Sequence, residues 1–371
     1  MRVKSAVVVG AGVIGATVAC ELTAAGYDVD VLDARSPAGG ATRASAGVLA
    51  PFIEGAPASA LRTLGHDSLN LYDDFIARLV RDSGESVVYE RTGTLEVGLT
   101  QAEAERLGSE SGHLWHAGIE GRWVPQALLP DVEPAVSSQA MGALLVPMHG
   151  YVGVSSLTRA ALAAATRRGA RVHAETGAVH IGTHAAGGAE VRTAQTTLTA
   201  DVVVMAAGSW STQVTVEDAA PVPVVPIRGQ LLQLQAARGL LRRVIWGTAG
   251  YLVPWPDGTV LVGATVEDVG FDESLTEEGC AGLRAMAAAL VPDLAQAPLV
   301  EARTGLRPKS PDDLPLIGRS SAVPALIYAT GHYRNGILLA PYTAQLVRRL
   351  VTDPSSTVPA EMRPERHGVR L

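Results

Sequence analysis

Residues 7–15 read Val7-Val8-Val9-Gly10-Ala11-Gly12-Val13-Ile14-Gly15, a run of β-branched residues that leads directly into three glycines. The β-branched run predicts a strand buried on both faces, as in the centre of a parallel sheet. The small and apolar residues 16–25 predict a helix that ends at Gly26, and residues 27–32 predict a second strand. Asp33 follows that strand directly. Strand, glycine turn, helix, strand and acid therefore come in the order of a nucleotide-binding βαβ unit.

Each glycine of this unit has its own physical role. Gly10 permits a tight turn, Gly12 allows a pyrophosphate to approach the backbone, and Gly15 allows the helix to pack closely on the strand. The N–H groups and partial positive charge at the helix N-terminus would stabilise phosphates. Asp33 is placed to accept hydrogen bonds from ribose hydroxyls. The unit predicts a dinucleotide site, without separating NAD from FAD.

The composition indicates a compact globular protein. The 371 residues are 47% hydrophobic and 18% charged, which is enough chain for two domains with their own cores. The net charge of −7 argues against nucleic-acid and anionic-membrane partners. Cys20 and Cys280 lack the spacing of metal ligands or of a disulfide framework, so no metal site is predicted. Because neither a signal peptide nor a membrane-spanning stretch is evident, we expect a cytoplasmic location.

The glycine-rich loop 34–47 follows Asp33 and carries Arg35 and Arg43. It is either a solvated surface loop or a second contact with the cofactor. Apolar spacing further along predicts one or two helices over 59–81 and a short exposed helix over 101–107. Helices are also predicted over 155–168, 274–290 and 336–350, the second with a capping box of Ser274 and Glu277. We expect residues beyond Asp353 to fray.

Short strands in close succession predict a second sheet. They cover residues 222–227, 229–235, 243–246, 251–254 and 259–262, and Asp257-Gly258 forms the tight turn between the last two. This density of strands is typical of an antiparallel sheet. The strand over 201–206 instead runs into a small-residue turn, like the opening strand. We therefore expect a discontinuous cofactor domain (1–50, 151–218 and 302–371) and a substrate domain (51–150 and 219–301).

Three further segments carry a family resemblance. They are AAGSWS (206–211), GLRPKSPDDLPLIG (305–318) and GHYRNGILLAP (331–341). Together with the opening motif and its continuation over Thr42–Gly47, they resemble the D-amino-acid oxidase superfamily of FAD enzymes over nearly the whole chain. Within that superfamily, the last segment is most similar to the bacterial glycine oxidases of thiamine biosynthesis.

The resemblance implies an α/β fold like that of p-hydroxybenzoate hydroxylase, in which a Rossmann-like FAD-binding domain carries an inserted antiparallel-sheet substrate domain. It implies non-covalent FAD, because Thr304-Gly305-Leu306 stands where flavin-linked relatives carry a cysteine. The N-terminus of the last helix would face the flavin and stabilise negative charge on it. The residues that the resemblance assigns to the cofactor are Gly10, Gly12, Val13, Ile14, Gly15, Asp33, Ala34, Arg35, Thr42, Arg43, Ser45, Ala46, Gly47, Val48, Ala178, Ala207, Gly208, Arg307, His332, Arg334, Asn335, Gly336, Ile337 and Leu338.

The resemblance also assigns catalytic residues. Arg307 would bind the substrate carboxylate, because a guanidinium can hold a carboxylate with two parallel hydrogen bonds. The alternative for Arg307 is a surface ion pair with Asp312 or Asp313. Tyr251 would donate a hydrogen bond to the same carboxylate, unless its ring only packs. Arg334 is either a positioning or a structural residue. We expect a structural or flavin-neighbouring role for Arg228 and a hydrogen-bonding role for His332.

The implied reaction moves a hydride from the substrate Cα to the flavin, after which the imine hydrolyses and oxygen is reduced to hydrogen peroxide. Three residues depart from the glycine oxidase pattern: Val48, Ala249 and Val266 replace a methionine, a histidine and a methionine. These smaller, more apolar side chains would enlarge the pocket. Candidate substrates are therefore glycine, sarcosine and small D-amino acids.

Three other functions are alternatives to this amine oxidase. A quinone-linked D-amino-acid dehydrogenase would share the first half-reaction without using oxygen. A flavin-binding sensor would not need a carboxylate-binding arginine and tyrosine. An NAD dehydrogenase leaves both C-terminal segments unexplained. The expected partners are thus a small amino-acid or amine substrate, oxygen and further copies of the chain in a homo-oligomer.

Overall fold

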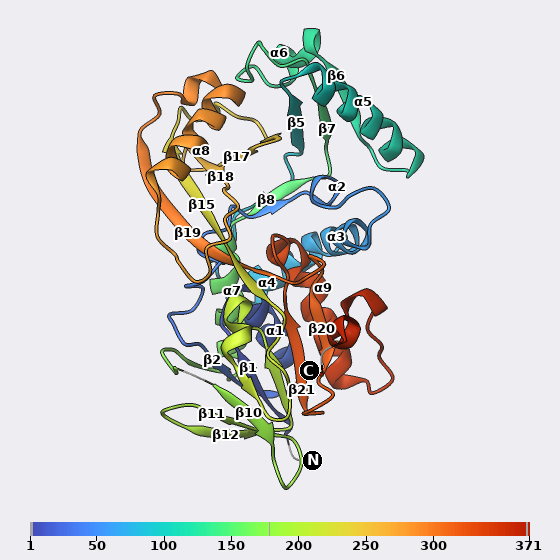
Figure 1. The fold of residues 1–371 in the computed structure, drawn as a ribbon, viewed down its shortest axis with the longest axis vertical. Coiled ribbons are helices and arrows are strands. Elements are labelled where there is room, and N and C mark those ends of the chain that lie inside the picture. Colours follow the sequence, from blue (N-terminus) through green and yellow to red (C-terminus); the bar gives the residue numbers. More distant parts are fainter. Residues whose placement is uncertain (1–2, 178, 369) are drawn as a thin grey trace.

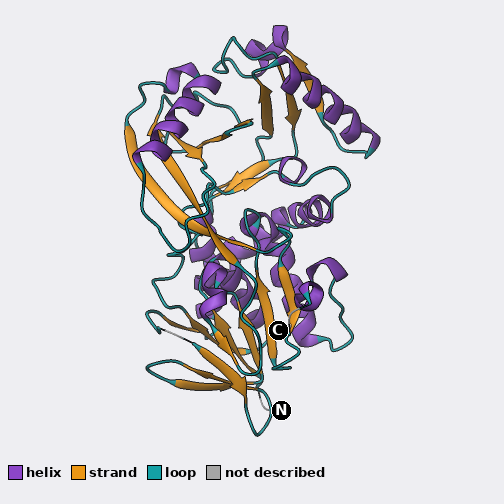
Figure 2. Cartoon of the chain, in the orientation of Figure 1, coloured by secondary structure: helices purple, strands orange, loops and turns teal. Residues whose placement is uncertain are grey.

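The structure is a computed structural model that describes residues 3–177, 179–368 and 370–371. Figure 1 shows an elongated molecule with a lower part, built around a mostly parallel sheet, and an upper part, built around a larger mixed sheet. Helices cover one face of the first sheet, and further helices lie beside the second sheet (Figure 2). Within the described ranges, every helix is too short or too polar to cross a lipid bilayer.

The first sheet, in the lower part, has the strand order β20, β21, β13, β1, β2, β9. Neighbouring strands are parallel except β20 and β21. β1 lies between β2 and β13, so the connections that follow the neighbouring strands run to opposite sides of β1. Their separation leaves a crevice at the carboxyl end of β1. The strands are β1 (Ser5–Val9), β2 (Asp28–Leu32), β9 (Arg171–His173), β13 (Val202–Met205), β20 (Leu316–Arg319) and β21 (Leu326–Thr330).

The two faces of β1 are buried in different layers. Ala6 and Val8 pack with the helices on one face, whereas Val7 and Val9 pack with a small sheet on the other. Successive side chains of a strand point to opposite faces, so the β-branched run fills both layers. The helices are α1 (Val13–Ala24), α3 (Ala60–Asn70), α4 (Tyr72–Ser83), α7 (Val154–Arg167) and α9 (Gly336–Thr352). The small sheet contains β10 (His180–Thr183), β11 (Ala189–Arg192), β12 (Thr197–Ala200) and β14 (Thr215–Val216).

The second sheet, in the upper part, has the order β19, β15, β18, β17, β16, β5, β7, β6, with neighbours antiparallel except β16 and β5. Its strands are β5 (Thr94–Gly98), β6 (Arg122–Pro125), β7 (Gly142–Val146), β15 (Val225–Gln235), β16 (Val244–Gly247), β17 (Gly250–Pro254), β18 (Thr259–Gly263) and β19 (Leu299–Lys309). Helices α5 (Gln101–His116), α6 (Leu129–Val132) and α8 (Glu277–Leu290) belong to this part. β19 crosses the predicted domain boundary at residue 302.

Short elements complete the fold. The strands β3 (Val48–Leu49), β4 (Tyr89–Glu90) and β8 (Gly150–Val152) form a small sheet, and β8 and the helix α2 (Pro51–Glu54) lie between the two parts (Figure 1). The 3₁₀ helices are η1 (Gln126–Leu128), η2 (Gly208–Gln213), η3 (Pro292–Leu294), η4 (Ala360–Met362) and η5 (Pro364–His367).

Three local expectations were wrong. The helix predicted over 101–107 extends to His116, because Leu107 and Leu114 lie on one face and are both buried despite the glycines between them. Thr276, not Ser274, caps α8, and its Oγ1 accepts a hydrogen bond from the Gly279 N–H at 3.2 Å. The described C-terminal residues do not fray: Leu371 is buried, and η4 and η5 are folded.

Candidate active site

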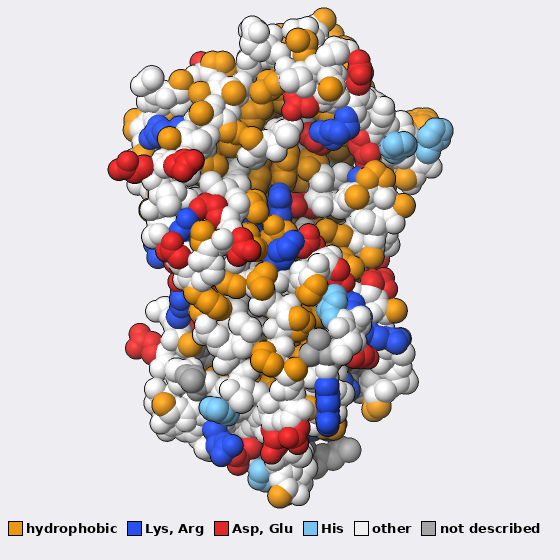
Figure 3. Space-filling view, in the orientation of Figure 1, with side chains coloured by type: hydrophobic (Ala, Val, Ile, Leu, Met, Phe, Trp, Pro, Cys, Tyr) orange, Lys and Arg blue, Asp and Glu red, His pale blue; other side chains and the backbone are white. Residues whose placement is uncertain are grey.

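A cavity of about 540 Å³ extends from the carboxyl ends of β1, β2 and β13 to the second sheet. Its lining also includes the loop after Asp33 and the start of α9. The space-filling view shows a hollow between the two parts, where basic and acidic side chains lie beside hydrophobic ones (Figure 3). The cavity therefore joins the crevice of the first sheet to side chains of the second.

The glycines of the first turn are required by close contacts. Gly10 has φ +109°, and a Cβ there would lie 2.3 Å from the Ala206 carbonyl oxygen. A Cβ on Gly15 would lie 1.8 Å from the Gly10 oxygen, so Gly15 serves helix packing and does not line the cavity. Gly12 lines the cavity, and its missing side chain leaves the backbone open to a ligand.

Asp33 fixes the glycine turn from the end of β2. Its Oδ2 accepts a hydrogen bond from the Ala11 N–H at 2.6 Å, and its Oδ1 accepts one from the Arg35 N–H at 2.8 Å. The Thr42 Oγ1 accepts a hydrogen bond from the Val13 N–H at 3.0 Å, which ties the following loop to the first turn of α1. A helix N-terminus, an acid and an unhindered glycine turn thus converge on one end of the cavity.

The two arginines of loop 34–47 behave differently. Arg35 lines the cavity, pairs with Glu273 through contacts of 3.1 and 2.7 Å, and lies 4.0 Å above the Trp210 ring. Arg43 is largely exposed and pairs with Glu301 at 3.4 Å outside the cavity lining. The loop is therefore both a cavity wall and a solvated surface.

The start of α9 forms another wall. Gly336 and Ile337 line the cavity, whereas Asn335 and Leu338 are buried behind it. His332 also lines it, and its Nε2 lies 3.0 Å from the Thr343 Oγ1. Burial lowers the pKa of His332 to about 3, so its ring is neutral near pH 7.

The remaining predicted cofactor residues can be placed together. Those that line the cavity are Val13, Ile14, Ala34, Ser45, Ala46, Gly47, Val48, Ala207, Gly208, Arg307 and Arg334. Ala178 lies outside the described residues.

Arg307 reaches the other end of the cavity from β19. Its Nη1 donates to the Thr265 carbonyl oxygen at 2.9 Å and to the Arg228 carbonyl oxygen at 3.4 Å. A Cβ on Gly229 would lie 2.2 Å from Nη2, so this glycine leaves room for the guanidinium. Among the residues that the structure describes, Arg307 has no acidic partner: Asp312 pairs with Arg366 and Asp313 with Lys309. Arg307 therefore does not form the surface ion pair with Asp312 or Asp313 that was the alternative interpretation.

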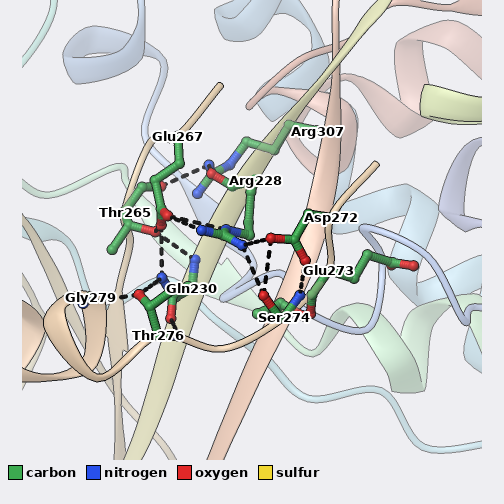
Figure 4. A network of polar contacts seen from close by, with 11 residues as sticks. Arg228, Gln230, Thr265, Glu267, Asp272, Glu273, Ser274, Thr276, Gly279 and Arg307 are labelled. Carbon is green, nitrogen blue, oxygen red and sulfur yellow. Dashed lines mark hydrogen bonds and ion pairs between the residues drawn. The ribbon is translucent and has the colours of Figure 1, made fainter. Parts of the chain in front are cut away.

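A polar network behind Arg307 holds the segment that supports it (Figure 4). Arg228 is buried outside the cavity lining and forms ion pairs with Glu267 and Asp272, the latter at 2.6 Å. The Gln230 Nε2 donates to Glu267 at 2.8 Å and to the Thr276 Oγ1 at 2.7 Å. These contacts fix residues 265–276, and with them the Thr265 carbonyl that accepts from Arg307.

Tyr251 lies beside Arg307 in the cavity lining. Its ring is 4.9 Å from that of Trp246, and Gly263 on β18 makes room for it, because a Cβ there would lie 2.7 Å from the ring. Burial raises the pKa of Tyr251, and the neighbouring Arg307 guanidinium opposes that rise. The hydroxyl therefore stays protonated near pH 7 and can donate a hydrogen bond.

Sequence reasoning missed Glu54, which lines the cavity from α2. Its carboxylate pairs with Arg334, with contacts of 3.1 Å to Nε and 3.3 Å to Nη2. Burial raises the pKa of Glu54, and Arg334 and Arg307 oppose the rise. The sequence held one signal that could have marked Glu54 as a candidate site residue. Glu54 is the only acidic residue between Asp33 and Asp67, and it follows the apolar residues 51–53.

These features define a dinucleotide-binding protein whose cavity ends in two arginines, a tyrosine and a glutamate. Comparison with known proteins specifies the family. The model of the DAO family, described as FAD dependent oxidoreductase, matches residues 5–350. The chain belongs to this family, is an FAD-dependent oxidoreductase, and has FAD as its cofactor.

Several relatives resemble the chain along most of its length. The chain is 33% identical to the bifunctional protein ThiO/ThiG of Nostoc sp. over 95% of its own length, and spans 53% of that relative. It is 31% identical to the glycine oxidase of Geobacillus kaustophilus, covering 93% of the chain and 92% of the relative. The crystal structure of that organism's glycine oxidase superposes with a TM-score of 0.89 at 30% identity, covering 94% of this chain and 95% of the other. The hydrogen cyanide synthase subunit HcnC of Pseudomonas aeruginosa is also 31% identical, over 98% of this chain and 95% of its own.

Proposed function

We propose that the protein oxidises a small amino acid with one carboxylate, such as glycine, sarcosine or a small D-amino acid, to the imine. The observation that carries this proposal is the Arg307 guanidinium, which faces the cavity beside the Tyr251 hydroxyl without an acidic partner among the described residues. A guanidinium and a phenol together bind a carboxylate well, and a sensor has no need of such a pair. The similarity to glycine oxidase supports the same substrate class.

The residues of the cavity fit FAD at both ends. The open backbone at Gly12, the Asp33 carboxylate and the N-terminus of α1 suit the adenosine and pyrophosphate. The N-terminus of α9 at Gly336 and Ile337 suits the flavin ring, whose added electron density a helix N-terminus stabilises. Among the described residues, neither Cys20 nor Cys280 lines the cavity, which agrees with non-covalent binding.

The protein's part in the reaction is to position the substrate. The chemistry that bound FAD supplies is removal of a hydride, two electrons and one proton, from the substrate Cα. Arg307 holds the carboxylate and Tyr251 donates to it, so the Cα–H has one orientation in the cavity. His332 is neutral and hydrogen-bonded to Thr343. It therefore lines the cavity and does not act as a base. Water then hydrolyses the imine to an oxo acid, and the nitrogen leaves as ammonia from a primary amino acid or as methylamine from sarcosine. Oxygen, as the final electron acceptor, is reduced to hydrogen peroxide.

The cavity lining supports a substrate larger than glycine as well. Val48, Ala249 and Val266 all line the cavity, and each is smaller or more apolar than the residue it replaces in the glycine oxidase pattern. An N-methyl group or a short D-side chain can pack against such residues without loss of a hydrogen bond.

Anaerobic titration tests the proposal. Glycine, sarcosine, D-alanine and D-proline are added separately to the FAD-loaded protein, with L-alanine as the control, while the visible absorbance of the flavin is followed. We expect at least one of the four to bleach the flavin fully, and we expect air to restore the absorbance with one hydrogen peroxide per molecule of substrate oxidised. No bleaching by any of them would refute the proposal. Bleaching that only a quinone reverses would instead identify a dehydrogenase.

A further inference from the structure

Glu54 lies where the proposed function places the substrate. Its carboxylate contacts both Nε and Nη2 of Arg334, and both residues line the cavity. The Glu54 side chain is only 14% exposed, against 35% for Arg334. Glu54 also lies close enough to Arg307 and Tyr251 to affect their electrostatics. The four side chains therefore form one charged cluster at the end of the cavity.

The charges of this cluster do not cancel. Arg307 and Arg334 each carry one positive charge, Glu54 carries one negative charge, and the Tyr251 hydroxyl is neutral. Arg334 is paired with Glu54, whereas Arg307 donates to two backbone carbonyls and has no acidic partner among the described residues. A net charge of +1 thus faces the cavity, which matches a substrate with a single carboxylate.

A second carboxylate on the substrate meets a different environment. Arg334 already binds an acid, and the Glu54 charge repels another one at close range. Without the Glu54 charge, the Arg334 guanidinium has its donors free for a second carboxylate. We propose that Glu54 is a specificity-determining residue that restricts the enzyme to monocarboxylic amino acids by neutralising Arg334. This inference rests on the proposed function.

The position of α2 does not depend on the Glu54 pair. The Arg62 Nε donates to the Gly55 oxygen at 2.9 Å, and its Nη2 donates to the Phe52 oxygen at 3.0 Å. The Phe52 ring stacks on His149 with a centroid distance of 5.6 Å. Because these contacts hold α2 on both sides of residue 54, Glu54→Gln removes the charge and leaves the helix in place.

The test uses two substrates that differ by one carboxylate. Sarcosine is N-methylglycine, and iminodiacetate carries a carboxyl group on that same N-methyl carbon. The rate of anaerobic flavin reduction is measured over a range of both substrates in the FAD-loaded wild type and in Glu54→Gln. We expect kcat/KM for iminodiacetate relative to sarcosine to rise at least tenfold in the variant. The double variant Glu54→Gln/Arg334→Gln should lose this gain, since Arg334 is the group that Glu54 releases.

Glu96→Gln is the matched control. Glu96 on β5 is similarly buried, with an 11% exposed side chain, and pairs with Arg106 at 2.7 Å, but it does not line the cavity. This variant changes the net charge equally and should keep the wild-type substrate ratio.

The outcomes separate the two proposals. If sarcosine bleaches the wild-type flavin but the ratio is unchanged in Glu54→Gln, the role of Glu54 is refuted and the proposed function stands. A loss of sarcosine turnover in Glu54→Gln without a gain for iminodiacetate would show that Glu54 holds the substrate amine instead. If none of the amino acids tested bleaches either protein, the proposed function fails, and the role of Glu54 fails with it.

Discussion

Gly229→Ala is the substitution that most sharply tests the position of Arg307. Gly229 lies within β15 outside the left-handed region, so the backbone accepts alanine. The new Cβ would lie 2.2 Å from Nη2 of Arg307 and 2.4 Å from its Cζ. Ordinary contact begins at 3.4 Å, so the guanidinium must retreat by about 1.2 Å. The clash falls on the flexible end of a long side chain, which can move without unfolding the sheet.

The size of the effect follows from this displacement. A misplacement of about 1 Å at a positioning group costs on the order of 100-fold in rate, or about 2.7 kcal/mol. We therefore expect kcat/KM for the best substrate to fall about 100-fold, while the melting temperature and FAD content stay near those of the wild type. Stopped-flow flavin reduction measures the first quantity, and differential scanning fluorimetry with flavin absorbance measures the others.

Gly282→Ala provides the control, because a Cβ at this position on α8 meets no atom within 4 Å. It should match the wild type in kcat/KM and FAD content, with an equal or slightly higher melting temperature, because alanine favours a helix over glycine. An unchanged kcat/KM in Gly229→Ala would show that substrate capture does not depend on where the Arg307 guanidinium lies. A loss of FAD in Gly229→Ala would show that the substitution acts through the cofactor site and not through the substrate site.

Other substitutions and conditions test the remaining parts of the site. Arg307→Ala should weaken substrate capture about 100-fold or more with FAD content unchanged, and equal KM values in variant and wild type would remove Arg307 from the substrate site. Heat or acid precipitation should release the flavin into the supernatant, and a yellow pellet would indicate a covalent bond. Burial lowers the pKa of His149 and of His332 to about 3, so the unfolded chain binds protons below pH 6.5 that the folded chain does not. Stability should therefore fall by about 1.4 kcal/mol per pH unit for each histidine between about pH 6 and pH 4, and urea unfolding curves that coincide at pH 7 and pH 5 would contradict this. Glu273→Gln removes the partner of Arg35 and should speed FAD release a few-fold, as followed by flavin fluorescence, and an unchanged rate would show that this exposed pair does not retain the cofactor.

The first strand, glycine turn and helix could be predicted, because each depends on residues that lie close together in the sequence. Gly10 and Gly15 are separated by only four residues, and their roles follow from one turn and one helix start. The β-branched run at residues 7–9 likewise reports burial on both faces, as the structure confirms. The length of α5 was underestimated, because the glycines in its sequence disfavour a helix. The packing of the buried Leu107 and Leu114 in the folded protein stabilises the helix beyond them.

The charged cluster could be predicted only in part. Arg307 and Tyr251 stand in segments that resemble a known family, so the resemblance located them. Glu54 and Arg334 are 280 residues apart in the chain, and no local pattern links them. Their pairing depends on α2 and the start of α9 meeting at one cavity, which is a consequence of the tertiary fold.

The position of the substrate carboxylate is tested most directly by a crystal structure of the FAD-loaded, chemically reduced protein with sarcosine bound. We expect the carboxylate oxygens within hydrogen-bond distance of the Arg307 guanidinium and the Tyr251 hydroxyl, with Glu54 still paired to Arg334. A carboxylate bound to Arg334, or a substrate held away from Arg307, would contradict the proposed site.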